Sequence, residues 1–472
     1  MQNHDHQSVP LETLADEFGT PLYVYSMDCV QERLHTLTRA FASIPFLVAY
    51  SVKANGNLAL LSRLAGTGCG ADIVSGGELY RALQGGVPPS RILFAGVAKS
   101  DEEIRAALEA GIYAFNVESG DELHRLDALA AGMKVQAPFA VRINPDILAP
   151  TPHEYTRTGH ATTKFGVAVP AAMELYRWAA SRPHLGARGI DVHIGSQIVD
   201  PAPYVAALKT ALEVVRQLET EGTVLEFVDL GGGFGIPYES DGMNIGALAQ
   251  ALLPVLRGRN LRLVLEPGRY LVGEAGVLLT RVRWVKRVSA SQAGEEGVEP
   301  EGIRSGRGES SAAHKVFVIT DAGMSDLLRP SHYGSYHPID VVGAARAEKE
   351  IVDVVGPLCE TGDFLARDRL LPLPRPGDLL AVRNVGAYGF SMASNYNGRP
   401  RPAEVMVETG RVHLIRKREE YWDLIRDESI PPPFAPIGIQ DKVRHCARSE
   451  IELGTEPDSP ADRPLSPTNP GE

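Results

Sequence analysis

The first 270 residues alternate between short apolar runs and longer stretches with helical periodicity. Eight of the apolar runs are rich in β-branched and aromatic residues, namely FLVAYSVKA (46–54), GADIVS (70–75), RILFAG (91–96), YAFNV (113–117), PFAVRIN (138–144), GIDVHIGS (189–196), EFVDLGGG (226–233) and LRLVLEPG (261–268). Amphipathic patterns fill most of the gaps, and a glycine often follows them, as at a helix C-terminus. Continuously apolar strands are typical of a parallel sheet buried on both faces. Eight strand–helix units therefore predict a (β/α)8 TIM-like barrel, with a doubly wound open sheet as the weaker alternative.

The pattern changes after Arg269, where strand-like runs follow one another without intervening helices. Such a succession predicts a C-terminal antiparallel β domain. Its runs are GVLLTRVRWVKRV (276–288), HKVFVITDAG (314–323), EIVDVVGPLC (350–359), DLLAVRNVGAYG (378–389) and AEVMVETGRVHLI (403–415). The segment PLYVYS (21–26) has the same character, and we expect it to join this domain.

These patterns divide the chain into four parts. We expect an N-terminal segment (1–30) that joins the β domain, a barrel (31–275), the β domain itself (276–425) and a disordered tail (426–472). A stretch at about 289–313 combines Gly, Ser and Glu without periodicity, and we interpret it as a disordered insertion within a hairpin.

Composition and charge narrow the class of protein. The 472 residues are 44% hydrophobic and 22% charged, as in ordinary globular proteins. A net charge of −12 argues against nucleic-acid binding, which needs clustered Lys and Arg. No apolar run reaches the roughly 20 residues of a membrane helix, and the polar N-terminus does not resemble a signal peptide. We therefore expect a cytoplasmic enzyme. The four cysteines have neither CxxC spacing nor a nearby His cluster, so neither a zinc site nor a disulfide framework is expected.

In a barrel of this kind, active residues lie at the C-terminal ends of the strands. The first strand ends at Lys53, and a lysine there is costly to bury as a charge. Taken alone, Lys53 is better explained as a loop residue that reaches solvent. The functional alternative is that Lys53 is a Schiff-base lysine, whose amine bonds to an aldehyde cofactor. The sixth strand ends at His193, and a lone histidine there is more often structural.

The seventh and eighth strands end in groups suited to an anion. Three consecutive glycines (231–233) can direct backbone N–H groups toward a phosphate and let it approach closely. The sequence around them is neither a Walker loop nor a Rossmann fingerprint. Glu266 and Arg269 follow the eighth strand, either as a structural ion pair or as contacts to a cofactor and a substrate.

Together these residues match a known family. The chain resembles the diaminopimelate decarboxylases, which are pyridoxal-phosphate enzymes of fold type III. The matching segments are AYSVKAN (49–55), GADIVSGGEL (70–79), HEYTRTGHATTKFG (153–166), HIGSQ (193–197), DLGGGFG (229–235), EPGR (266–269), LLRPSHYGSYH (327–337) and GPLCETGD (356–363). They occur in order over roughly Thr20 to Arg411, and their co-linearity makes the resemblance specific.

The resemblance implies pyridoxal 5'-phosphate as cofactor, and it implies a role for each matching residue. Lys53 would hold the cofactor, with Asp72 behind it as an orienting group. His193 would stack on the cofactor ring, and Glu266 would pair with the ring nitrogen. The phosphate contacts would come from Ser196, Gly233, the backbone around Gly268 with Arg269, and Tyr388.

On the substrate side, the resemblance implies a site shared between two subunits. Arg269, Arg329 and Tyr333 would hold the distal carboxylate, with Tyr388 beside them. Glu360 would take the distal ammonium, and Cys359 would protonate the carbanion left by carbon dioxide. Because this Cys-Glu pair comes from the other subunit in the family, a homodimer is implied. A free cysteine is otherwise most often a small buried hydrophobe.

The implied activity is that of a carboxy-lyase converting meso-2,6-diaminopimelate into L-lysine and carbon dioxide, the last step of lysine biosynthesis. One alternative is a related decarboxylase acting on ornithine, lysine, arginine or a modified amino acid. The first three lack a distal carboxylate and would leave Arg329 unpaired. Another is an inactive regulatory homologue, which would be expected to lack Lys53 or the cofactor contacts. No metal site and no contact with membrane or nucleic acid are expected.

Overall fold

The computed structural model describes residues 9–147, 163–289, 314–343 and 348–432. The chain divides into two compact units, Met1–Leu424 and Ile425–Glu472. Both sheets belong to the first unit. The expected insertion at about 289–313, most of the expected tail and most of the HEYTRTGHATTKFG motif lie outside the described residues.

Eight parallel strands form a closed barrel in the first unit. Their order is β5-β4-β3-β2-β10-β9-β8-β6, and pairing of β5 with β6 closes the ring. The strands are β2 (Phe46–Ser51), β3 (Gly70–Ile73), β4 (Ile92–Phe94), β5 (Ala114–Val117), β6 (Ala137–Asn144), β8 (Leu185–Asp191), β9 (Phe227–Asp229) and β10 (Arg262–Leu265). The short β7 (Val167–Ala168) extends β6. The predicted barrel is confirmed. Six of its strands fall within the predicted runs, whereas β6 begins one residue before its run and β8 begins four residues before its run.

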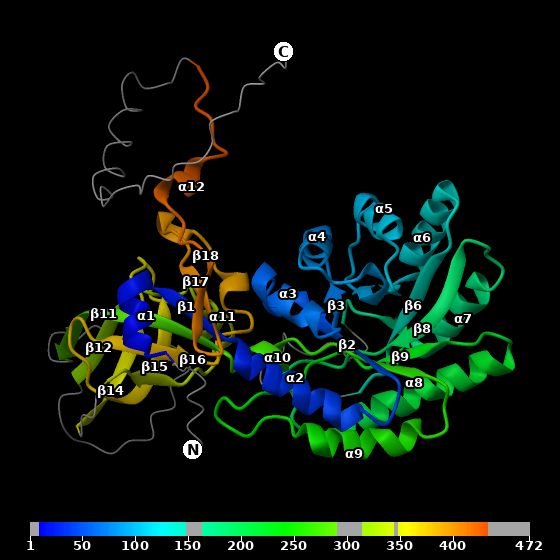
Figure 1. The fold of residues 1–472 in the computed structure, drawn as a ribbon, viewed down its shortest axis with the longest axis horizontal. Helices are drawn as coiled ribbons and strands as arrows, with labels where there is room; N and C mark the ends of the chain where they lie inside the picture. The colour runs from blue at the N-terminus through cyan, green and yellow to red at the C-terminus, as the bar shows by residue number, and fades with distance from the viewer. Residues whose placement is uncertain (1–8, 148–162, 290–313, 344–347, 433–472) are drawn as a thin grey trace, which may run out of the picture. The chain divides into compact units, whose positions relative to one another are not determined.

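One helix precedes the first barrel strand and the others follow barrel strands, and Figure 1 shows them on the outside of the ring. They are α2 (Met27–Phe41), α3 (Leu58–Gly66), α4 (Gly76–Gln84), α5 (Asp101–Ala110), α6 (Gly120–Met133), α7 (Val169–Ala179), α8 (Ala202–Thr220) and α9 (Ile245–Leu256). A serine side chain caps the N-terminus of each of α4, α5 and α6, where backbone N–H groups lack partners. Gly111, in the left-handed region, ends α5.

Among the described residues, the second sheet has nine strands and is mixed rather than purely antiparallel. Its main order is β15-β14-β12-β11-β1-β17-β18, with β16 pairing β11 and β13. The strands are β1 (Leu22–Ser26), β11 (Gly276–Ser289), β12 (His314–Thr320), β13 (Ile339–Val341), β14 (Lys349–Val355), β15 (Phe364–Pro372), β16 (Leu379–Arg383), β17 (Ala403–Glu408) and β18 (Arg411–Arg416). Most pairs are antiparallel, but β1–β17 and β12–β14 are parallel. The segment near the N-terminus joins this sheet through β1.

Two strands of this sheet were not predicted from the sequence. The run of β15, FLARDRLLP, carries three consecutive charged residues at its centre, which hid its strand character. The very short β13 has no pattern of its own. The predicted run at 403–415 is a hairpin, because Thr409 and Gly410 both have positive φ, as a tight two-residue turn requires.

Hydrogen bonds join the barrel to the second sheet next to the end of β2. The Asn55 side chain donates to the carbonyl of Gly386 (3.2 Å), and Asn57 donates to Glu404 (3.0 Å). The backbone N–H of Tyr388 donates to the carbonyl of Ala54 (2.8 Å). These bonds fix Tyr388, from the second sheet, beside the strand end that carries the candidate lysine.

In the described part of the chain, every helix is too short or too polar to cross a lipid bilayer.

Candidate active site

A cavity of about 570 Å³ lies where the C-terminal ends of the barrel strands meet the second sheet. Barrel residues on its wall include Lys53, His193, Ser196 and Arg269. Residues that follow the barrel in sequence complete it, and they include Arg329, Tyr333 and Tyr388. Seven of the residues singled out in the sequence therefore line one cavity. Asp72 and Glu266 do not line it but lie 2.8 Å from Lys53 and 3.9 Å from His193, respectively. Gly233, Gly268, Cys359 and Glu360 do not line it either.

Lys53 is held in this cavity by a buried acid. Its Nζ donates to Oδ2 of Asp72 at 2.8 Å, and Asp72 is fully buried on β3. The Ser51 hydroxyl donates to the same oxygen at 2.8 Å. Burial alone lowers the pKa of Lys53, but the charges of Asp72 and Glu266 outweigh it, so its pKa is raised. Asp72 thus fixes the direction in which the amine points.

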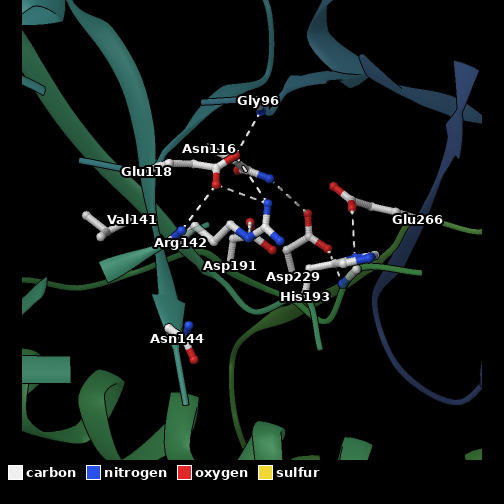
Figure 2. A network of polar contacts seen from close by, with 12 residues as sticks. Gly96, Asn116, Glu118, Val141, Arg142, Asn144, Asp191, His193, Asp229 and Glu266 are labelled. Carbon is white, nitrogen blue, oxygen red and sulfur yellow. Dashed lines mark hydrogen bonds and ion pairs between the residues drawn. The ribbon is translucent and has the colours of Figure 1, made fainter. Parts of the chain in front are cut away.

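Glu266 is buried at the end of β10 with one oxygen unused. Its Oε2 lies 3.9 Å from Nδ1 of His193, whereas Oε1 has no partner among the described residues (Figure 2). Burial, with Asp229 and Asp72 nearby, raises the pKa of Glu266 well above its usual range. A buried carboxyl with a free oxygen is costly unless a donor reaches it. The site therefore suits a ligand that presents a protonated ring nitrogen.

His193 lies beside Glu266 as a neutral ring. Its Nδ1 accepts a hydrogen bond from the backbone N–H of Gly232 at 3.3 Å. Burial and the positive charges of Arg142 and Lys53 hold the pKa of His193 well below its usual value. A neutral imidazole at the cavity wall can stack on a flat ligand without adding a positive charge.

Further charged residues fill the barrel interior beneath Glu266 (Figure 2). Asp191 and Asp229 pair across β8 and β9, and both are almost fully buried. Burial raises the pKa of Asp229 to about 6 and, together with Asp229, raises that of Asp191. Arg142 on β6 lies 3.9 Å from Asp191 and donates to both oxygens of Glu118 at 3.2 Å. This group was not predicted from the sequence, although a charged residue inside each of the apolar runs PFAVRIN and GIDVHIGS was a usable signal.

The three glycines after β9 are required by close packing. A Cβ on Gly231 would lie 2.2 Å from His193 Nδ1, and one on Gly232 would lie 2.0 Å from the Glu266 carbonyl oxygen. A Cβ on Gly233 would lie 2.0 Å from the Gly195 carbonyl oxygen, and its φ is +83°. The amides of Gly231 and Gly232 donate to Asp229 and His193. No acceptor for the Gly233 amide is found in the described part of the chain, so that amide is the one open to an anion.

Replacing Gly231 with alanine is expected to destabilise the fold by about 2–4 kcal/mol, because the new methyl group meets His193 and φ is positive. Thermal unfolding measures the effect. Gly132→Ala in α6 is the matched control, because nothing lies within 4 Å of its added Cβ, and a stabilisation of roughly 0.5–1 kcal/mol is expected. Equal melting temperatures for Gly231→Ala and the unmodified protein would contradict the packing argument.

Two buried arginines stand at the other end of the cavity without an acidic partner. Arg269 and Arg329 are each 7% exposed, and neither has a carboxylate within ion-pair distance in the described residues. Arg269 donates to the hydroxyls of Tyr238 (3.0 Å) and Ser196 (3.1 Å), and Arg329 donates to that of Ser335 (3.2 Å). Burial and the charge of Arg269 lower the pKa of Arg329. Two like charges without a counter-charge among the described residues suit this end of the cavity to an anion.

Cys359 and Glu360 lie on an exposed turn outside the cavity. The carboxylate of Asp363 fixes the turn by accepting from the amides of Leu358 and Met324, each at 2.6 Å. The Asn397 side chain accepts from the Cys359 amide at 3.3 Å. An ordered turn therefore holds the Cys359 side chain in an exposed position. This position does not agree with the interpretation of Cys359 as a small buried hydrophobic residue.

Comparison with known proteins decides the family. Residues 27–273 match the model of the pyridoxal-dependent decarboxylases, pyridoxal binding domain. Diaminopimelate decarboxylase from Neisseria meningitidis serogroup B is 47% identical over 414 residues, covering 88% of this chain and 94% of the relative. The chain belongs to the diaminopimelate decarboxylase family. The family's enzyme from Pseudomonas aeruginosa is 44% identical over 427 residues, covering 90% of this chain and 97% of the relative.

The solved structures agree with this assignment. Diaminopimelate decarboxylase from Helicobacter pylori, in complex with L-lysine, superimposes with a TM-score of 0.80 at 39% identity. The match covers 88% of this chain and 98% of that one. The family resemblance predicted from the sequence motifs is therefore confirmed, and the family is a pyridoxal-dependent one.

Proposed function

We propose that this chain decarboxylates meso-diaminopimelate to L-lysine with pyridoxal 5'-phosphate as cofactor. The observation that carries the proposal is that one cavity holds Lys53 together with two buried arginines, which have no acidic partner in the part of the chain that the structure describes. An amine able to bond an aldehyde and a separate carboxylate site together select an amino acid with a second carboxylate. The relatives named above support the same substrate.

The residues behind the cavity fit this cofactor. Glu266 has a buried free oxygen for the ring nitrogen, and Lys53 reaches the cavity with its amine fixed by Asp72. When bound, the cofactor supplies an electron sink for the carbanion formed as carbon dioxide leaves. Ser196, Gly233, the backbone around Gly268 and Tyr388 would hold its phosphate, and His193 would hold its ring flat.

This chain's own residues then orient the substrate and move protons. Arg269, Arg329 and Tyr333 would bind the distal carboxylate and so align the reacting carboxylate. A buried site without water strengthens each of these contacts. The thiol of Cys359 would supply the proton that replaces the lost carboxylate, and Glu360 would bind the distal ammonium.

Product analysis tests the proposal directly. Purified protein loaded with pyridoxal phosphate is incubated with meso-diaminopimelate, and lysine and carbon dioxide are measured by mass spectrometry. Ornithine, lysine and arginine are assayed in parallel. Equal turnover of ornithine or lysine would overturn the substrate assignment in favour of a polyamine-type decarboxylase. A protein that binds no cofactor would point to an inactive homologue.

The proposed site requires a homodimer, because the Cys359 turn is exposed and does not line the cavity of its own chain. In a symmetric dimer the turn of each subunit would enter the cavity of the other. The expectation is that mixing inactive Lys53→Ala with inactive Cys359→Ala restores activity. Random exchange makes half of the dimers hybrid with one intact site each, so recovery of about a quarter is expected.

Kinetic assays after subunit exchange measure this recovery, and mass spectrometry of intact dimers provides the control for exchange. Mixing Lys53→Ala with Glu266→Ala should restore nothing, since both residues belong to the same barrel. If hybrid dimers form and remain inactive, the site is built within one chain.

A further inference from the structure

Tyr238, which was not predicted as a site residue, lies between the two buried arginines. It follows the glycine turn in GGGFGIPY and lines the cavity. Its ring centroid is 5.9 Å from the guanidinium carbon of Arg269 and 5.9 Å from that of Arg329. Its hydroxyl accepts a hydrogen bond from Arg269 at 3.0 Å. In the described residues no acceptor is found for the proton of this hydroxyl.

Two side-chain amides hold the loop that carries Tyr238. Gln197, in the barrel, donates to the carbonyl of Ile236 (2.6 Å) and accepts from its amide (3.1 Å). Asn384, after β16, donates to the carbonyl of Pro237 at 2.7 Å. Gln197 and Asn384 have φ of 61° and 60°, a conformation that costs free energy in residues other than glycine. The side chains of both strained residues therefore form hydrogen bonds to the backbone of the same short loop, residues 236–237.

A buried histidine supports the tyrosine ring from behind. His337 is fully buried, and its ring contacts that of Tyr238 edge to face with centroids 5.4 Å apart. Its Nδ1 donates to the carbonyl of Arg383 at 3.0 Å. Burial and the charge of Arg329 lower the pKa of His337 to about 3, so the ring adds no charge beside the arginines. The position of Tyr238 is fixed by the barrel, by the loop after β16 and by His337.

We infer that Tyr238 is a fourth ligand of the distal carboxylate, beside Arg269, Arg329 and Tyr333, with its hydroxyl donating to the anion. Because Arg269 already donates to the phenol oxygen, the remaining proton is directed away from Arg269 and into the cavity. The inference rests on the proposed function, and it adds a specificity-determining residue to that site. Its contribution applies only to ligands that keep the distal carboxylate.

The test compares two ligands that differ in this group alone. L-Lysine, the product, retains the distal carboxylate, whereas pentane-1,5-diamine lacks it. Affinities of both for the cofactor-loaded enzyme are measured by calorimetry for the unmodified protein and for Tyr238→Phe. The variant should bind L-lysine about tenfold more weakly, since it loses a hydrogen bond to a charged group. Binding of the diamine should change less than twofold. The KM for meso-diaminopimelate should rise with little change in kcat.

Matched variants separate this role from a structural one. Tyr176→Phe also removes a buried hydroxyl, which donates to the Gly189 carbonyl and accepts from the Val141 amide. Tyr176 does not line the cavity, so both affinities should stay constant. Asn384→Gly keeps the positive φ while releasing the loop, and should weaken L-lysine binding in the same direction. Asn384→Gly replaces Tyr238→Phe as the test variant if Tyr238→Phe does not fold.

Unchanged L-lysine affinity in Tyr238→Phe would overturn the inference, and so would an equal loss of affinity for both ligands. Failure of the proposed function is distinguishable from either outcome. In that case the unmodified enzyme does not convert meso-diaminopimelate, while the two binding measurements can still be made.

Discussion

Replacing Lys53 with alanine is expected to abolish decarboxylation, with kcat falling by at least about 10³-fold. The amine of Lys53 is the one group on the described cavity wall that can bond an aldehyde, and Asp72 fixes its direction at 2.8 Å. Its loss removes both covalent attachment and the proton transfers of that amine. Steady-state carbon dioxide release measures the activity.

A chemical readout makes the same prediction without relying on turnover. Borohydride treatment of the loaded enzyme should fix the cofactor to the peptide that contains Lys53, and Lys53→Ala should remain unlabelled. Lys209→Ala, on the exposed face of α8, is the control and should keep full labelling and activity. Labelling of another lysine would show that the site has been placed wrongly.

The barrel was predictable because its strands are buried on both faces. Most positions of each strand are therefore apolar, and eight such runs recur along the chain. The same logic fails for β15, where only part of the strand is buried and charged residues occupy its centre. The mixed character of the second sheet was also beyond the pattern, since the strand order depends on long-range pairing between β1 and β17.

For the candidate site, motifs located the residues but not their relations. That Lys53 and His193 share a cavity follows from both lying at the ends of barrel strands. The sequence predicted that the three glycines bind a phosphate, but it did not predict that close contacts with His193, Glu266 and Gly195 require glycine at these positions. Tyr238 was missed because it stands on a loop after the strand end and depends on side-chain amides distant in sequence.

The acids inside the barrel show why position matters more than residue type. Asp191 and Asp229 are ordinary residues in the sequence, but they face one another across two parallel strands. Together with burial and the charge of Asp72, their negative charges raise the pKa of Glu266 despite the opposing charge of Lys53. This electrostatic environment keeps a proton near Glu266, which suits a partner that must itself stay protonated.

Replacing Arg329 with leucine is expected to lower kcat/KM for meso-diaminopimelate by about 10²–10³-fold, since truncating one partner of a buried charge pair costs roughly 3–4 kcal/mol. Arg329 is 7% exposed and has no acidic partner in the described part of the chain, so the substrate's distal carboxylate would be its counter-charge. Removing the guanidinium leaves that carboxylate without a full set of donors. Steady-state kinetics with a mass-spectrometric assay of lysine measure the loss.

The sharper consequence of Arg329→Leu concerns selectivity. A site built for a charged group rejects analogues that lack it, because its own polar groups are left unpaired. The unmodified enzyme should therefore use lysine or ornithine poorly, and Arg329→Leu should narrow this difference by losing activity on meso-diaminopimelate alone. Arg375→Leu removes the same charge at an exposed turn away from the cavity. This variant should change neither kcat/KM for meso-diaminopimelate nor its ratio to kcat/KM for lysine or ornithine. A variant that lost activity equally on all three substrates would show that Arg329 supports the fold or the cofactor, and the carboxylate site would have to be placed elsewhere.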